Sequence, residues 1–378
     1  MELLENDMAR KGTYGLLIAG GKTGGHLFPG MAVAGKFLER GADREVLFIG
    51  TRDGIESRVL PRAGYPLVTV RSAGIRGKGV VAKIKALCLT PVALIESIKA
   101  ILSFGPKVAL GVGGYVSGPA LLAVWIMRVP FAIQEQNVTA GLTNRILARL
   151  AEKVFVSFEE SAEFFPGDKV VVTGNPVRPE VIETPKGEPE LRLEKFGPGK
   201  TLLVFGGSQG ANAINRAVVD FFRSHPKIRD HTNLIHQTGK ADINEVREAY
   251  SDMGYDRAVV TPFIYGMGEA YRVADLVLCR SGAGAVFELA ALGKPAVLVP
   301  FPQAVGDHQT FNAAALVKHG AAAMVKQNDI EKGALARALK ELLTDDEKLA
   351  SMAGKAASFS KRDSAEEICG HLENMARN

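Results

Sequence analysis

Two stretches of the chain, YGLLIAGGKTGGHLFPGMAVAGKFLER at residues 14–40 and TLLVFGGSQGANAINRAVVDFF at residues 201–222, share one pattern. Each begins with an apolar run typical of a buried strand, continues through clustered glycines, and ends in an amphipathic segment with helical spacing. A strand, a glycine turn and a helix in that order open a parallel α/β sheet. The repeated pattern therefore predicts two such sheets.

A second pair of glycine turns supports this prediction. Residues 110–124, LGVGGYVSGPALLAV, correspond to residues 278–292, LCRSGAGAVFELAAL. The length of 378 residues also exceeds what one hydrophobic core usually supports. We therefore predict an α/β fold of two Rossmann-like, doubly wound domains that face each other across a cleft. The polar stretch at residues 183–200, rich in proline and glycine, is the expected linker.

The expected boundaries follow from these patterns. We assign residues 1–176 to the N-terminal domain and residues 177–360 to the C-terminal domain, with a last helix at about residues 361–378 that packs back onto the first domain. In the first half we expect strands near residues 14–21, 45–50, 107–111, 130–134, 153–157 and 169–174, and helices at 80–103, 119–127 and 142–150. Pro29 is expected in the first turn of the first helix.

Composition excludes several classes of protein. The three cysteines are widely spaced, which fits a reducing cytoplasm and no disulfide framework or metal cluster. The first residues lack the apolar run of a secretory signal. An uncharged stretch between Lys107 and Arg128 contains Pro119 and a glycine turn, so we do not expect it to span a membrane.

Basic residues gather in one segment of a chain whose formal net charge is +5. They are Arg71, Arg76, Lys78, Lys83, Lys85, Lys99 and Lys107, with Glu96 as the one counter-charge and apolar residues among them. Composition alone favours a solvated helix face over a membrane surface. Nucleic acid is not an expected partner, because aromatic residues are scarce there and no recognition motif is present.

The glycine turns are candidate phosphate-binding loops. A P-loop is excluded because Leu16 stands where that motif needs a glycine, and the spacing of a dinucleotide-binding loop is also absent. Clustered glycines at a helix amino terminus nevertheless let backbone amides approach an oxygen-rich anion. One such loop commonly serves only tight packing, but four in matching positions favour two diphosphates.

Seven motifs in order carry a resemblance to a known family. They are GGKTGGH from residue 20, GVGGYVSGP from 111, QEQNVTAGLTNR from 134, GNPVR from 174, GGSQGA from 206, CRSGA from 279 and DHQTFNA from 307. The chain resembles the MurG family, GT-B enzymes of glycosyltransferase family 28. The resemblance implies an inverting hexosyltransferase that moves N-acetylglucosamine from UDP-N-acetylglucosamine to the muramyl sugar of undecaprenyl-diphosphate-linked MurNAc-pentapeptide. This converts lipid I to lipid II in peptidoglycan synthesis, on which cell shape and division depend.

The resemblance also assigns residues to the substrates. Donor contacts are expected at Thr23, Gly24, Gly25, Asn137, Arg178, Ser208, Ile264, Ala283, Gly284, Ala285, Val286, Phe287, Glu288 and Gln309. The acceptor diphosphate is expected at Gly113, Gly114, Tyr115 and Ser117. A carboxylate at Glu288 suits the ribose hydroxyls, and backbone groups of Ile264 suit the uracil edge.

The chain departs from the family pattern at several positions. Lys22 stands where a third glycine is common, and Gln134 where a histidine usually precedes Glu135. Gly284 and Ala285 replace a bulky aliphatic residue and a hydroxyl residue, although backbone amides at that helix start could still bind phosphate. Phe287 replaces a small hydroxyl residue, and the sequence offers no reason for it.

The implied reaction is one direct displacement, which needs a base for the acceptor hydroxyl. His26 is the first candidate, since the unperturbed pKa of an imidazole lies near 6.5, and Glu135 is the second. A loop histidine that only bonds phosphate or backbone is the alternative for His26. No Asp-x-Asp metal motif is present, so we expect no metal and no cofactor, with Mg²⁺ at most stimulatory.

A polyprenyl acceptor implies a partner surface that composition alone did not favour. Ile75, Val80, Val81, Ile84 and Leu87 are interleaved with Arg76, Lys78, Lys83 and Lys85, and Trp125 and Arg145 are expected on the same face. We expect this face to hold the enzyme peripherally on the anionic cytoplasmic face of the cell membrane.

Three other functions remain open. A diacylglycerol glycosyltransferase would share the donor site, and a UDP-sugar 2-epimerase would share the fold without a lipid. A non-catalytic UDP-sugar-binding regulator is the third.

Overall fold

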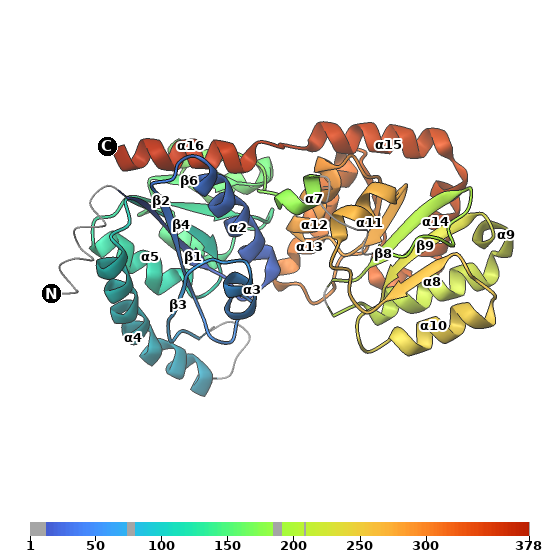
Figure 1. The fold of residues 1–378 in the computed structure, drawn as a ribbon, viewed down its shortest axis with the longest axis horizontal. Helices are drawn as coiled ribbons and strands as arrows, with labels where there is room; N and C mark the ends of the chain where they lie inside the picture. Colours follow the sequence, from blue (N-terminus) through green and yellow to red (C-terminus); the bar gives the residue numbers. More distant parts are fainter. Residues whose placement is uncertain (1–12, 74–79, 184–190, 208, 378) are drawn as a thin grey trace. The chain divides into compact units, whose positions relative to one another are not determined.

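The computed structural model describes residues 13–73, 80–183, 191–207 and 209–377, without the side chains of residues 80–87. The contacts divide the chain into two compact units (Figure 1). Unit 1 comprises residues 1–178 and 362–378, and unit 2 comprises residues 179–361. None of the helices in these described ranges is both long and apolar enough to cross a bilayer.

Unit 1 is built around a seven-stranded sheet with the order β3-β2-β1-β4-β5-β6-β7, in which every neighbouring pair is parallel. Its elements are β1 (Tyr14–Gly20), α2 (Gly24–Glu39), β2 (Arg44–Gly50), α3 (Glu56–Arg62), β3 (Leu67–Thr69), α4 (Val80–Phe104), β4 (Val108–Gly113), α5 (Ser117–Ile126), β5 (Phe131–Glu135), α6 (Leu142–Leu147), β6 (Lys153–Val156), η1 (Glu159–Phe164), η2 (Gly167–Lys169), β7 (Val170–Val172) and α16 (Ser364–Arg377).

Helices cover both faces of this sheet, which explains why its strands are continuous apolar runs. Successive residues of a strand point to opposite faces. Leu16 and Ile18 of β1 join a core with α2, α3 and α16. Leu17 and Ala19 join a second core with α4, α5 and α6.

Unit 2 has a six-stranded parallel sheet with the order β10-β9-β8-β11-β12-β13. Its elements are α7 (Pro179–Ile182), β8 (Lys200–Phe205), α8 (Asn212–Ser224), α9 (Pro226–Arg229), β9 (Thr232–Gln237), α10 (Ile243–Asp252), β10 (Ala258–Thr261), α11 (Met267–Val273), β11 (Leu276–Cys279), α12 (Ala283–Ala291), β12 (Ala296–Leu298), η3 (Val305–Asp307), α13 (His308–Lys318), β13 (Ala322–Met324), η4 (Gln327–Asp329), α14 (Ala334–Thr344) and α15 (Asp346–Phe359).

The strand orders place the glycine loops at corresponding points of the two sheets. In unit 1 the order reverses between β1 and β4, and in unit 2 it reverses between β8 and β11. Ligands of open α/β sheets bind beyond the carboxyl ends of the strands at such a reversal. All four glycine turns identified in the sequence follow these four strands.

The predicted fold class of two doubly wound α/β sheets is confirmed, but two local boundaries were wrong and two short elements were missed. Helix α2 begins at Gly24, one turn earlier than expected, so Pro29 lies inside the helix. There its nitrogen cannot donate the helical hydrogen bond to the carbonyl of Gly25. Helix α6 ends at Leu147, earlier than expected. Elements α3 and β3 were not predicted, because both are short and carry little periodicity.

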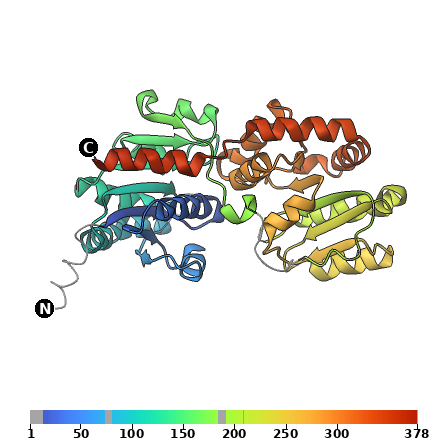
Figure 2. The same cartoon turned by 45° about the horizontal axis from the view of Figure 1, so that its top comes forward.

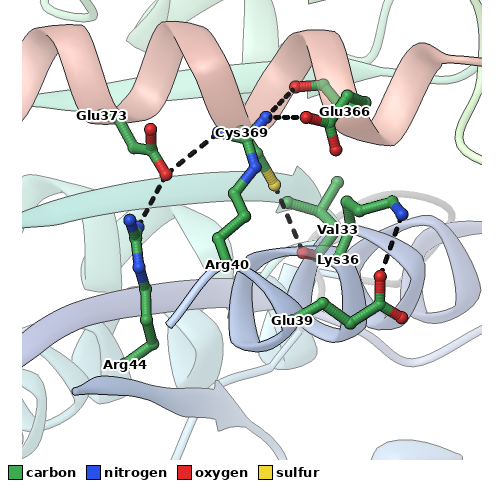
Figure 3. Close-up of polar contacts among 8 residues, drawn as sticks. All are labelled: Val33, Lys36, Glu39, Arg40, Arg44, Glu366, Cys369 and Glu373. Atoms are coloured by element: carbon green, nitrogen blue, oxygen red, sulfur yellow. Dashed lines mark hydrogen bonds and ion pairs between the residues drawn. The ribbon is translucent and has the colours of Figure 1, made fainter. Parts of the chain in front are cut away.

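The last helix packs on unit 1. Figure 2 shows α16 running along this unit, where it contacts α2 and β4 and buries Ile368 and Leu372 in the core. Glu373 pairs with Arg40 at 2.9 Å and with Arg44 at 2.7 Å (Figure 3). Burial opposes ionisation of Glu373, but the hydrogen bonds and charges of the two arginines outweigh it and lower its pKa.

Candidate active site

The first glycine loop of unit 1 joins β1 to α2. Thr23 precedes the helix in extended conformation, and Gly24 and Gly25 form its first turn. The Thr23 hydroxyl lies 3.1 Å from Nδ1 of His26. His26 is partly exposed, and its ring edge lies beside Gly113, where a β-carbon would stand 3.1 Å from Nε2. The imidazole is thus oriented by a hydroxyl on one side and faces the second glycine loop.

The second glycine loop contacts the first directly. The amide of Gly21 donates to the carbonyl oxygen of Gly113 at 3.3 Å. Gly113 and Gly114 both have left-handed backbones, and a β-carbon on Gly114 would lie 2.9 Å from the carbonyl oxygen of Gly21. Only glycines permit this approach. The buried Ser117 hydroxyl donates to Gly114 at 2.7 Å and closes the turn at the start of α5.

A buried acid that the sequence analysis missed supports the first glycine loop. Glu56 is 0% exposed and accepts from the Thr51 amide and hydroxyl, each at 2.8 Å, and from the Lys22 amide at 2.7 Å. It follows the strand EVLFIG and the turn TRDGI, so its position beyond the carboxyl end of β2 was a signal available in the sequence. Burial raises the pKa of the neighbouring Tyr115 hydroxyl; a hydrogen bond with Thr51 opposes this in part, and the charges of Glu56 and Asp53 add to it.

The two candidate bases differ in what surrounds them. Glu135 is 2% exposed, and its carboxylate accepts from the amide and side chain of Asn137, from the Gly141 amide and from the Asn144 side chain. These bonds hold the loop after β5 in place, which is a positioning role. Between the two, the geometry favours His26 as the base.

The other expected donor residue of unit 1 is Arg178. Its guanidinium lies over the ring of Phe28, 4.5 Å from the centroid. Phe28 belongs to α2, so the cation is held beside the first turn of that helix. A positive charge at this point favours an anion at the helix amino terminus.

In unit 2 the loop after β8 is bound to the loops that follow β9 and β10. Gln237 donates to the carbonyl oxygen of Gly207 at 2.9 Å and accepts from the Ile264 amide at 2.9 Å. A β-carbon on Gly210 would overlap the carbonyl of Thr238. Ile264 is buried, and this bond to Gln237 engages its amide. Ser208 lies outside the described residues.

A buried polar network anchors this loop, and the sequence analysis missed it too. Asn215 donates to the Thr238 carbonyl at 2.9 Å and to Asp242 at 2.7 Å. Its side-chain oxygen lies 3.1 Å from Nε2 of His236, whose Nδ1 lies 2.9 Å from the Tyr250 hydroxyl. An amide oxygen only accepts, so Nε2 carries the proton. Burial lowers the pKa of His236 to about 3, with Asp242 opposing the shift in part.

The amino terminus of α12 lies beyond β11. Gly284 and Ala285 are partly exposed in its first turn, whereas Val286 is buried. Glu288 is partly exposed and accepts from the Tyr271 hydroxyl at 3.1 Å. Phe287 is 3% exposed with its ring 5.8 Å from that of Phe359 in α15, so the residue that the sequence left unexplained fills the core.

Gln309 lies in the first turn of α13, and its side-chain oxygen is engaged. It accepts from the Phe301 amide at 2.9 Å, and its carbonyl accepts from the Ser281 hydroxyl at 2.8 Å. Arg280 donates to the carbonyls of Val299 and Pro300, which directly precede Phe301. Within the described ranges, no group of three or more His, Cys, Asp or Glu side chains could hold a metal ion.

Comparisons with known proteins agree with this arrangement. The glycosyltransferase family 28 N-terminal domain matches residues 16–156, and the family's C-terminal domain matches residues 201–368. A protein of Myxococcus xanthus named UDP-N-acetylglucosamine--N-acetylmuramyl-(pentapeptide) pyrophosphoryl-undecaprenol N-acetylglucosamine transferase is 44% identical over 93% of this chain and 91% of its own length. A Geobacter metallireducens protein of the same name is 44% identical over 96% of this chain and 99% of its own.

Solved structures give the same result. The crystal structure of Acinetobacter baumannii MurG superposes with a TM-score of 0.74 and 30% identity, covering 96% of this chain and 99% of that one. A UDP-GlcNAc 2-epimerase of Neisseria meningitidis bound to UDP-GlcNAc has a TM-score of 0.65 but 15% identity over 96% of this chain and 100% of its own, a likeness of fold alone. The chain therefore belongs to glycosyltransferase family 28 and, within it, to the MurG family.

Proposed function

We propose that this protein transfers N-acetylglucosamine from UDP-N-acetylglucosamine to the muramyl sugar of undecaprenyl-diphosphate-linked MurNAc-pentapeptide, converting lipid I to lipid II with inversion. The observation that carries the proposal is the 44% identity, over nearly the full length of both chains, to relatives named for this reaction. As a step of peptidoglycan synthesis, it supports cell shape and division.

Within unit 2 we assign the uridine of the donor to the groups at the carboxyl edge of the sheet. Glu288 accepts from the ribose hydroxyls, and the Ile264 carbonyl meets the uracil. The amides of residues 283–287 at the start of α12 face the diphosphate, where a helix amino terminus favours negative charge. Gln309 and Ser208 are the other donor contacts that we assign to this unit.

Within unit 1 we assign the acceptor diphosphate to Gly113, Gly114, Tyr115 and Ser117. We assign further contacts with the donor to Thr23, Gly24, Gly25, Asn137 and Arg178. Support comes from the contact between the two glycine loops, which places their backbone groups and the His26 ring together.

The reaction is one displacement at the anomeric carbon. His26 accepts the proton of the acceptor hydroxyl, whose oxygen bonds to that carbon while the bond to the UDP oxygen breaks and its electron pair leaves with UDP. The Thr23 hydroxyl beside Nδ1 orients the ring. Backbone amides and Arg178 stabilise the leaving diphosphate, so the proposal needs no bound metal or cofactor.

We further propose that the enzyme acts peripherally on the anionic, cytoplasmic face of the membrane. Trp125 and Ile126 at the end of α5 are 48% and 46% exposed, and Leu142 and Ile146 of α6 are 64% and 57% exposed. Helices α5 and α6 pack together, and Arg145 of α6 is exposed, with its guanidinium over the ring of Phe164. Apolar and cationic groups together favour an interfacial position. Of the basic residues, Arg76, Lys78 and the side chains of Lys83 and Lys85 fall outside the described part of the chain, whereas Arg71 is described and pairs with Glu96 at 2.7 Å.

Transfer of radiolabelled sugar from UDP-N-acetylglucosamine, with and without a water-soluble muramyl-pentapeptide diphosphate acceptor, tests the reaction. Label must appear on this acceptor and not on diacylglycerol. Conversion of the donor sugar without acceptor would instead indicate a 2-epimerase, and UDP binding without any turnover a regulator.

Vesicle co-sedimentation tests the membrane surface separately. A Trp125→Ser, Ile146→Ser variant should sediment less with anionic vesicles than wild type and keep its activity on the soluble acceptor. Leu38→Ser is the matched control, because Leu38 is an exposed apolar residue of α2, which covers the other face of the sheet. Equal sedimentation of all three proteins would rule out this surface. A Lys78→Glu, Lys83→Glu, Lys85→Glu variant tests the basic segment in the same way.

A further inference from the structure

The first glycine loop contains a lysine in a conformation that favours glycine. Lys22 has φ of +76°, in the left-handed region, where a β-carbon costs free energy. Strained backbone of this kind gathers at functional sites and persists when its surroundings hold it. Here the Lys22 amide donates to the buried Glu56 carboxylate at 2.7 Å. The loop thus carries a long cationic side chain at a position whose backbone conformation favours glycine.

The Lys22 ammonium is directed towards the second glycine loop. Its Nζ lies over the ring of Tyr115, 4.7 Å from the centroid. A cation held over an aromatic face is oriented but keeps hydrogen-bonding capacity for another partner. In the described parts of the chain, Lys22 forms no ion pair with a carboxylate. Its side chain is exposed, so a ligand can reach it.

Two acidic side chains near the glycine loops provide negative charge that the Lys22 ammonium can offset. Glu56 is buried beneath the first loop, and it and Asp53 lie close enough to Tyr115 to act on its hydroxyl electrostatically. Two acids near a diphosphate site disfavour binding of an anion. The Lys22 amide points at Glu56 and is not available to a phosphate. The ammonium is therefore the group of Lys22 that can offset these acids.

We propose that Lys22 binds the diphosphate of the lipid acceptor, between the first glycine loop and Tyr115. This inference rests on the proposed function, which assigns the acceptor diphosphate to the loop from Gly113 to Ser117. The donor also carries a diphosphate, so the same chemistry has two possible sources. The position of the ammonium over Tyr115, a residue of the second loop, favours the acceptor.

Steady-state kinetics with the water-soluble acceptor separate these sources. Lys22→Gln removes the charge and keeps the β-carbon, Lys22→Gly removes both, and Lys22→Arg keeps the charge. Loss of a charge-assisted contact should raise the KM for acceptor roughly tenfold in the Gln and Gly variants, with kcat and the KM for UDP-N-acetylglucosamine changed less than about twofold. The Arg variant should stay close to wild type.

Two further readouts complete the test. Inhibition by a short-chain polyprenyl diphosphate should weaken by a similar factor in Lys22→Gln, independently of turnover. Lys22→Gly should also raise the melting temperature, as should the matched control Arg128→Gly, since Arg128 is an exposed residue at the end of α5 with φ of +57°. The control should leave the KM for acceptor unchanged.

The outcomes distinguish this inference from the proposed function. Absence of transfer by the wild type would overturn the proposed function and the inference with it. A normal wild type with unchanged acceptor KM in Lys22→Gln would overturn the inference alone. A rise confined to the KM for UDP-N-acetylglucosamine would place Lys22 at the donor and equally overturn it.

Discussion

Asn215 in unit 2 allows a sharp test of whether the buried network positions the glycine loop after β8. Its side chain is 1% exposed and makes three hydrogen bonds, to Thr238, Asp242 and His236. The substitution Asn215→Ala leaves these groups without that partner. Each buried polar group left unsatisfied costs about 1–3 kcal/mol, and since Asp242 keeps its bond from Asn212 we expect a total loss of about 3 kcal/mol. For a domain of this size the melting temperature should fall by about 6–12 °C.

The functional consequence follows from what Thr238 holds. The Thr238 backbone lies against Gly210, and the adjacent Gln237 bonds Gly207, so release of Thr238 loosens the loop proposed to face the donor. We expect the KM for UDP-N-acetylglucosamine to rise about tenfold, equivalent to about 1.4 kcal/mol. Differential scanning calorimetry and initial-rate kinetics at saturating acceptor measure the two effects.

Asn233→Ala is the matched control. Asn233 is a buried asparagine at the opposite, amino end of β9, where it exchanges hydrogen bonds with the amide and carbonyl of Gly197 at 3.0 and 2.9 Å. Its removal should lower the melting temperature and leave the donor KM unchanged. If both variants lose stability and neither changes the donor KM, the network is structural and the positioning role is wrong.

Other predictions concern the proposed site and its pH dependence. His26→Ala should lower kcat by about 10²–10⁴ with UDP affinity by calorimetry unchanged, and an equal loss of UDP binding would make His26 a structural loop residue. Glu288→Ala should weaken UDP binding by about 1–3 kcal/mol, so an unaltered affinity would remove Glu288 from the site. Gln309→Ala should reduce discrimination against the C4 epimer of the donor sugar, measured as a ratio of kcat/KM values; an unchanged ratio would restrict Gln309 to its bond with Phe301. Burial holds the pKa of His236 at about 3 in the folded state, below its ordinary 6.5, so only the unfolded chain takes up this proton below pH 6.5. The stability from His236 is complete above that pH and declines towards pH 3, by about 2 kcal/mol at pH 5. The pH slope of the unfolding free energy should be shallower in His236→Gln, and equal slopes would contradict this.

Sequence alone determined the two sheets and the positions of their glycine loops. Runs such as LLIA in β1 and LLVF in β8 have the length and composition of buried parallel strands, and the glycines after them mark the carboxyl edge where ligands bind. These are local signals, readable within about ten residues. The sequence located the ends of helices less accurately, as at the start of α2, because a proline inside a helix cannot be distinguished by sequence from one in its first turn.

Only the tertiary structure decided which polar groups hold those loops. Glu56 accepts a hydrogen bond from Lys22, and Asn215 bonds to Thr238 and His236. These partners are more than twenty residues apart in the sequence, so neither helical nor strand periodicity relates them. Only the folded structure likewise shows that Glu135, which the sequence offered as a base, is surrounded by donors of its own loop. The presence of phenylalanine at position 287 is explained only by the tertiary structure, in which Phe359 of α15 lies beside it. Apolar periodicity specifies which face of an element is buried, whereas a buried polar group is specified by its partners, and those are known only once distant segments have met.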